Sequence, residues 1–119
     1  AGGAAVSGLQ GTEEGFLQQI KTLAVACGWL PYHTRRSKGS DPGFPDLVLV
    51  KGERLLFWEL KVGKGKLTPA QRAWASALEF IADGTHTIRR PYLDGGMVEY
   101  RWLTPSDWDY IARTLKEEP

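Results

Sequence analysis

The sequence contains a single cysteine, and this scarcity excludes several classes of protein. With Cys27 alone, the chain has neither an internal disulfide nor a thiol-based zinc cluster, so it is neither a disulfide-stabilised scaffold nor a zinc finger. We therefore expect an intracellular protein in which Cys27 is an ordinary buried thiol.

Long hydrophobic runs are missing as well. The longest apolar stretch, residues 23–30, is interrupted by Gly28 and is far shorter than the roughly 18 to 20 residues that span a bilayer. We therefore expect no membrane segment. Residues 1–5 lack the basic and apolar regions of a secretory signal, so residues 1–11 are interpreted as a flexible lead or an expression remnant. The remainder, 12–119, has the length and the ordinary composition of a single globular domain.

A strong net charge is also absent, since the formal total is only +1, but the distribution is uneven. Residues 31–72 contain nine Lys or Arg and four Asp or Glu, which leaves this segment at +5 and the rest of the chain at −4. A basic surface of this kind attracts polyanions such as nucleic acid. A solvated basic surface without a partner explains the charge equally well.

Capping residues and hydrophobic spacing predict three helices and several strands. Thr12 is expected to cap a helix that ends at Gly28, and Thr68 a second helix that ends near residue 83. A third helix follows Thr104. Strands are expected over residues 29–34, 47–50, 55–61, 85–90 and 97–103. This order predicts an α/β fold with a mixed sheet and helices on its faces.

Two packing expectations follow from the same patterns. The strands over 47–50 and 55–61 are largely apolar, so we expect a hairpin that is covered on both faces. The second helix is expected to bury Trp74, Leu78 and Ile81 along one stripe. The five tryptophans fall at core-like positions, and none is assigned to DNA.

Three charged residues form the strongest chemical pattern in the sequence. Glu59 and Lys61 stand two apart on an expected strand, so both side chains leave the same face of the sheet. The hairpin brings Asp46 back beside them at the same end. Two carboxylates suit a hard divalent cation such as Mg²⁺, and Lys61 could orient or deprotonate an attacking water. The pattern therefore indicates phosphodiester hydrolysis.

This pattern resembles the PD-(D/E)xK nuclease superfamily, with Pro45-Asp46 followed by twelve residues and then Glu59-Leu60-Lys61. Within the superfamily, the chain from about Glu13 onward is most similar to the virus-type replication-repair nuclease domain, VRR-NUC. The residues that carry the resemblance are Glu14, Gln18, Gly28-Trp29, Tyr32-His33, Gly43-Phe44-Pro45-Asp46, Glu59-Leu60-Lys61, Gly65-Lys66-Leu67-Thr68, Gln71, Trp74 and Pro105-Ser106-Asp107-Trp108.

The resemblance implies a fold, a set of roles and a metal. The fold is a restriction-endonuclease-like αβββαβ core, and the metal is Mg²⁺ or Mn²⁺. Asp46, Glu59 and the Leu60 carbonyl would be metal ligands, with Glu14 as the acid from the first helix. Lys61 would be the catalytic lysine and Gln71 a residue beside the metal-bound water. Members of this size resemble phage or prophage enzymes that act as homodimers on branched DNA such as Holliday junctions. They would work in the cytoplasm of a bacterial or phage-infected cell.

Each of these residues also has a structural explanation. Asp46 could be a turn residue after proline, and Glu59 with Lys61 a solvent-facing ion pair. Gln71 could serve only to cap the second helix with Thr68. Glu14 could be an acid favoured by the helix dipole, and its neighbour Glu13 leaves the choice of ligand open. Gly15 departs from the family pattern, because it weakens the first turn beside this acid.

The basic residues near these carboxylates are interpreted as contacts to DNA phosphates. They are His33, Arg35, Arg36, Lys38, Lys64 and Lys66. The sequence shows no helix-turn-helix or zinc finger, so we expect recognition of shape and backbone rather than of base sequence. The alternatives are a sequence-specific restriction-type endonuclease and a DNA-binding module that no longer cuts.

Overall fold

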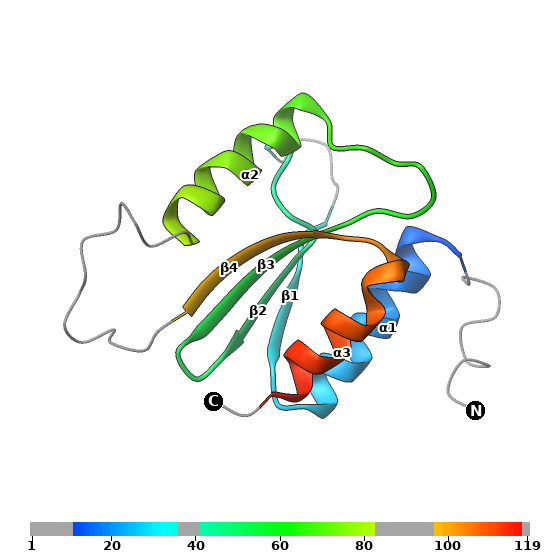
Figure 1. Cartoon of the computed structure of the whole chain (residues 1–119), viewed down its shortest axis with the longest axis vertical. Helices are drawn as coiled ribbons and strands as arrows, with labels where there is room; N and C mark the ends of the chain where they lie inside the picture. The colour runs from blue at the N-terminus through cyan, green and yellow to red at the C-terminus, as the bar shows by residue number, and fades with distance from the viewer. Residues whose placement is uncertain (1–10, 36–40, 83–96, 118–119) are drawn as a thin grey trace.

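The computed structural model describes residues 11–35, 41–82 and 97–117, and these form an α/β fold. A four-stranded mixed sheet has the order β1-β2-β3-β4, with three helices on its faces (Figure 1). The strands are β1 (Leu30–His33), β2 (Leu47–Lys51), β3 (Arg54–Leu60) and β4 (Met97–Leu103). The helices are α1 (Glu13–Ala26), α2 (Pro69–Ala82) and α3 (Trp108–Lys116), and a short 3-10 turn (Pro105–Asp107) precedes α3.

The sheet is antiparallel across its first three strands and parallel at β3 and β4. The turn between β2 and β3 contains Gly52 at a positive φ, as a tight hairpin requires. The chain then crosses over through α2, which allows β4 to lie parallel to β3. The expected helices and the strands over 29–34, 47–50, 55–61 and 97–103 are confirmed to within a few residues. The strand expected over 85–90 lies outside the described residues.

One face of the sheet carries the main hydrophobic core. Alternate residues of β2 and β3 point to this face, where α1 and α3 lie side by side over the sheet (Figure 1). Thr12 caps α1 as expected, because its hydroxyl accepts a hydrogen bond from the Gly15 N–H at 2.9 Å. The largest fully buried side chains of the core are Trp58, Ile20, Leu47, Leu49, Leu56, Leu60, Ile111 and Leu115.

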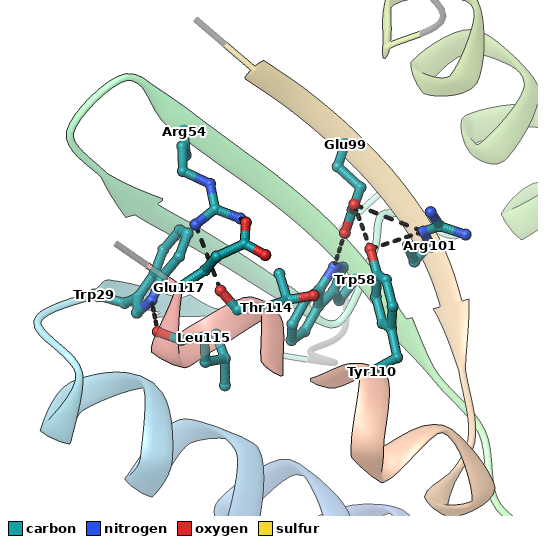
Figure 2. A network of polar contacts seen from close by, with 9 residues as sticks. All are labelled: Trp29, Arg54, Trp58, Glu99, Arg101, Tyr110, Thr114, Leu115 and Glu117. Atoms are coloured by element: carbon teal, nitrogen blue, oxygen red, sulfur yellow. Dashed lines mark hydrogen bonds and ion pairs between the residues drawn. The ribbon is translucent and has the colours of Figure 1, made fainter. Parts of the chain in front are cut away.

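The C-terminal end of α3 is held by side chains from the opposite half of the chain. The indole N–H of Trp29 donates to the Leu115 carbonyl at 2.9 Å, and Arg54 donates to the Thr114 carbonyl at 3.4 Å (Figure 2). The Arg54 guanidinium also lies over the Trp29 ring, 5.0 Å from its centroid. Two of the last carbonyls of α3, those of the buried Thr114 and Leu115, therefore have side-chain partners.

A second polar network joins β3, β4 and α3. The Glu99 carboxylate accepts hydrogen bonds from the Trp58 indole at 2.9 Å and from the Tyr110 hydroxyl at 2.5 Å (Figure 2). Arg101 donates to the Tyr110 oxygen at 3.0 Å. Burial, followed by the bond to Glu99, raises the pKa of Tyr110 above its ordinary value. This network fixes α3 to the edge of the sheet.

The other face of the sheet is covered only in part. Helix α2 packs on β3 and β4, where Ala75 and Leu78 contact Phe57 and Tyr100. On the side of β1 and β2, the side chains Leu30, Tyr32 and Val50 are exposed. The expectation that the hairpin is covered on both faces is therefore right for β3 and wrong for β2.

The orientation of α2 corrects a second packing expectation. Its buried residues are Gln71, Ala75 and Leu78, whereas Trp74 is 36% exposed and Ile81 is 50% exposed. The helix is turned so that the Gln71 amide, rather than the Trp74 indole, faces the sheet. Trp74 packs at the flank instead, edge-on to Phe44 with ring centroids 4.9 Å apart. Cys27, expected to be buried, is half-buried at the margin of the core.

Candidate functional site

Asp46 immediately precedes β2 and is hydrogen-bonded to the end of β3, which carries Glu59 and leads to Lys61. Its Oδ2 accepts a hydrogen bond from the Leu60 N–H at 2.8 Å. Its backbone carbonyl accepts from the Thr34 N–H at 2.9 Å, and the preceding Pro45 carbonyl accepts from the Thr34 hydroxyl at 2.7 Å. Asp46 is therefore held on two sides, by β3 through its carboxylate and by the end of β1 through its backbone.

Glu59 and Lys61 flank the residue that Asp46 contacts. Glu59 is 1% exposed and Lys61 is 7% exposed, so the interpretation of this pair as a solvent-facing ion pair is wrong. The Lys61 N–H donates to the Leu103 carbonyl at 3.0 Å, which holds the chain beyond β3 against the end of β4. Charged side chains are seldom buried unless their surroundings compensate for the lost hydration. Glu59 and Lys61 are both buried, and Asp46 is bonded to the residue between them. These three residues mark this end of β3 as a specialised site.

Gln71 links the start of α2 to this site with both ends of its amide. Its oxygen accepts from the Thr68 N–H at 2.8 Å, while the Thr68 hydroxyl accepts from the Gln71 N–H at 3.2 Å. This confirms the capping box. The amide nitrogen donates to Glu59 Oε2 at 3.2 Å. The structural and the functional interpretations of Gln71 therefore do not compete, because one side chain serves the helix and also contacts the carboxylate.

The loop before Asp46 touches the start of α2 at a glycine. Gly43 has φ +90°, and a Cβ atom there would lie 2.5 Å from the carbonyl carbon and oxygen of Ala70 and 2.8 Å from the Gln71 nitrogen. Only glycine allows this approach of backbone to backbone. Gly43 thus sets the spacing between the segment that carries Asp46 and the helix that carries Gln71.

A cavity of about 570 Å³ opens beside Asp46 at the N-terminal end of α1. Asp46 and Leu60 are shared by this cavity and by the cluster just described. His33 and Arg35, two of the predicted phosphate contacts, also line it. The lining residues are Glu13, Glu14, Leu17, His33, Thr34, Arg35, Asp46 and Leu60.

Glu14, the acid predicted on the first helix, is bonded within its own helix. Glu14 is exposed and accepts a hydrogen bond from Gln18 at 3.1 Å. Glu13 lines the same cavity, so the choice between the two acids stays open. Within residues 11–35, 41–82 and 97–117, no three His, Cys, Asp or Glu side chains are gathered into a group that could hold a metal. The hydrogen bonds thus connect Asp46 to Leu60 and Gln71 to Glu59 at the end of β3, beside the buried Lys61, whereas Glu14 lines the cavity.

The oxygen atoms available at the site are of the type that a hard divalent cation binds. Mg²⁺ and Mn²⁺ take oxygen ligands, and Mg²⁺ keeps several waters, so it needs only one or two carboxylates from the protein. Asp46, Glu59 and the Leu60 carbonyl offer oxygen atoms only. Asp46 accepts a hydrogen bond from the Leu60 N–H and Glu59 accepts one from the Gln71 amide, and a carboxylate has about four acceptor positions in all.

The remaining predicted DNA contacts divide into three groups. His33 and Arg35 line the cavity. Lys64 and Lys66 are exposed on the loop between β3 and α2. Arg36 and Lys38 lie outside the described residues.

One residue of the site was not predicted from the sequence. Tyr100 lies on β4 opposite Phe57, on the same face as Glu59, and is 8% exposed. Burial raises the pKa of its hydroxyl far above the ordinary value, and the charges of Glu59, Glu79 and Asp46 raise it further. The alternation of Val98, Tyr100 and Trp102 in the sequence predicts that these three share a face, but it gives no sign that Glu59 is near.

Comparison with family models, with curated proteins and with solved structures finds no match for this chain. No helix among the described residues is long and apolar enough to cross a membrane. The function of the protein is therefore inferred from the residues of the site.

Proposed function

We propose that the protein is a metal-dependent nuclease that hydrolyses phosphodiester bonds in DNA. One observation carries this proposal: the Asp46 carboxylate is bonded to the peptide N–H of Leu60, the residue between the buried Glu59 and Lys61. The Asp46 carboxylate is thus bonded to the end of β3, where Glu59 and Lys61 stand two residues apart. This is the arrangement that the sequence pattern predicts for phosphodiester hydrolysis.

The order of elements supports a restriction-endonuclease-like core. From α1 to β4 the chain runs helix, three strands, helix, strand, which is the αβββαβ order that the resemblance to the VRR-NUC domain implies. The pairing also fits, because the three consecutive strands form an antiparallel unit and the last strand returns parallel after a helix.

Each residue then has a distinct task. Asp46, Glu59 and the Leu60 carbonyl would hold Mg²⁺ or Mn²⁺, which when bound supplies a Lewis acid for the phosphoryl oxygen. Lys61 holds or deprotonates the attacking water and balances negative charge that develops on the phosphate. Gln71 fixes the orientation of the Glu59 carboxylate and lies beside the water. Water is the nucleophile, so no covalent intermediate with the protein forms.

The substrate is proposed to be DNA that is recognised by backbone and shape. His33 and Arg35 line the cavity beside Asp46, and Lys64 and Lys66 are exposed on the loop that follows Lys61. These side chains suit phosphate contacts. By resemblance, the preferred substrate is branched DNA such as a Holliday-type junction. The protein would act as a homodimer in the cytoplasm of a bacterial or phage-infected cell.

Cleavage of labelled DNA tests the proposal. A four-way junction, a flap and a plain duplex are incubated with the wild-type protein in Mg²⁺, in Mn²⁺ and in EDTA. We expect metal-dependent cutting, and a loss of about a hundredfold or more in Asp46→Asn and in Lys61→Met. Lys51→Met is the matched control, because Lys51 lies at the opposite end of the hairpin, beside its turn, and its loss should leave the rate unchanged.

The alternatives are outcomes of the same experiment. Cutting of the linear duplex at one defined sequence would favour a restriction-type endonuclease. Binding of DNA without cutting in either metal would refute catalysis and leave a DNA-binding module.

A further inference from the structure

The Tyr100 hydroxyl is the one buried side-chain polar atom without a hydrogen-bond partner in the part of the chain that the structure describes. A buried hydroxyl that has given up water and gained no partner destabilises a fold. Such atoms are uncommon in proteins, and an ordered water or a functional role often explains them. The position of Tyr100 indicates which explanation applies.

Tyr100 is held between β3 and α2. Its backbone pairs with Phe57 on β3, and its side chain packs against Ala75 and Leu78 of α2. Phe57 and Leu67 lie against the same small cluster. Because β3 and α2 hold the ring, the hydroxyl of Tyr100 has a defined position.

Tyr100 lies on the face of the sheet that also carries Glu59. Glu59 follows Phe57 by two residues on the same face of β3, so it lies one position along the sheet from the residue opposite Tyr100. On α2, Gln71 lies one turn before Ala75 on the buried face, and its amide donates to Glu59 at 3.2 Å. Tyr100 on β4 and Gln71 on α2 therefore lie on the same side of the sheet as Glu59, and Gln71 contacts it directly.

The charges around the hydroxyl agree with this geometry. Of the charged groups that act on it, Glu59 has the largest effect, followed by Glu79 on α2 and Asp46 on β2. All three are acids, so the hydroxyl stays protonated and is a donor. A polar group that faces a carboxylate without a direct bond is commonly connected to it by one water molecule.

We propose that Tyr100 is a positioning residue of the site, whose hydroxyl donates through one bound water to the Glu59 carboxylate. Together with the Gln71 amide it fixes the direction of the carboxylate oxygens before a metal arrives. The hydroxyl does not touch the substrate, and no bond in it forms or breaks. This inference rests on the proposed nuclease function.

Two matched variants test it. Tyr100→Phe removes only the hydroxyl, and Tyr110→Phe removes a hydroxyl of the same kind that is bonded to Glu99 away from the site. For each variant we measure the thermal midpoint, the affinity for Mn²⁺ by calorimetry without DNA, and the cleavage rate against Mg²⁺ and against DNA concentration.

The two variants should respond in opposite ways. Tyr100→Phe should keep or raise the thermal midpoint, weaken Mn²⁺ binding about tenfold and lower kcat about tenfold, with KM for DNA unchanged. Tyr110→Phe should lower the thermal midpoint by a few degrees and leave Mn²⁺ affinity and kcat as they are.

The possible failures are distinct. If the wild-type protein cuts DNA and Tyr100→Phe matches it in Mn²⁺ affinity and in rate, the role of Tyr100 is refuted and the nuclease stands. If Tyr100→Phe lowers the thermal midpoint as Tyr110→Phe does but leaves Mn²⁺ affinity and kcat unchanged, the hydroxyl has only a structural role and the inference is also refuted. If the wild-type protein neither binds Mn²⁺ nor cuts DNA, the nuclease proposal itself fails.

Discussion

Replacement of Gly43 by alanine should damage both the fold and the site, through one close backbone contact. Two effects add at this position. A non-glycine residue at φ +90° is strained by about 1–3 kcal/mol. The new Cβ would also lie 2.5 Å from backbone atoms of Ala70, and such overpacking costs about 1–3 kcal/mol because the loop or the helix must move.

Part of this destabilisation is offset in the unfolded chain. Alanine has less conformational freedom than glycine there, which returns about 0.4–1 kcal/mol. The free energy of unfolding should therefore fall by about 2–4 kcal/mol, and the thermal midpoint by about 10 °C or more, as measured by urea and heat denaturation. Gly52→Ala is the control, since Gly52 has φ +59° with nothing within 4 Å of a Cβ. It should show the backbone strain alone, a fall of about 1–2 kcal/mol.

Activity should separate the two variants more sharply than stability does. Relief of the contact at Gly43 requires a shift of about 1 Å between the loop that leads to Asp46 and the start of α2, and a misplacement of that size can cost about a hundredfold in rate. Gly52→Ala should cut DNA at the wild-type rate well below its midpoint. Equal stability and equal rates in the two variants would refute the argument that Gly43 sets the spacing of the site.

Three further predictions follow from the hydrogen bonds. Because the pKa of Tyr110 is raised in the folded protein, its contribution to stability should be complete below pH 10 and lost as the pH rises through that higher pKa. Urea denaturation between pH 8 and 11 should therefore show a smaller fall in the free energy of unfolding for Tyr110→Phe than for the wild type. Trp29→Phe should lower the free energy of unfolding by about 1–3 kcal/mol, because the buried Leu115 carbonyl loses its donor. Trp102→Phe, whose side chain is 43% exposed, should change it by less than about 0.5 kcal/mol in the same denaturation experiment. Glu59→Gln should keep the fold by circular dichroism and abolish Mn²⁺ binding in calorimetry, and retained Mn²⁺ affinity would exclude Glu59 as a ligand.

The elements that the sequence predicts well are those whose signals are local. Thr12 and Thr68 mark the starts of α1 and α2 because a cap depends on residues three positions away. The hairpin of β2 and β3 follows from two apolar runs with Gly52 between them, and the pairing of these strands brings Asp46 to the end of β3.

The features that the sequence does not reveal depend on contacts between distant residues. The stripe of α2 was misjudged because hydrophobicity alone favours Trp74 and Ile81, whereas a bond to Glu59 turns Gln71 to the inside. The burial of Arg54 depends on Trp29 and Thr114, which are remote in sequence. The register of β4 against β3, which brings Tyr100 toward Glu59, is likewise set by a crossover rather than by a turn.

The two bonds of the Gln71 amide have a consequence for how this chain tolerates sequence drift. The oxygen closes the first turn of α2 and the nitrogen orients Glu59, so a substitution here is selected against twice, once for folding and once for the site. Glutamate at this position would keep the cap but set a second negative charge against Glu59, and alanine would lose both contacts. A descendant without Glu59 could therefore accept either glutamine or glutamate at position 71, because both cap the helix, whereas a chain that keeps Glu59 is restricted to glutamine.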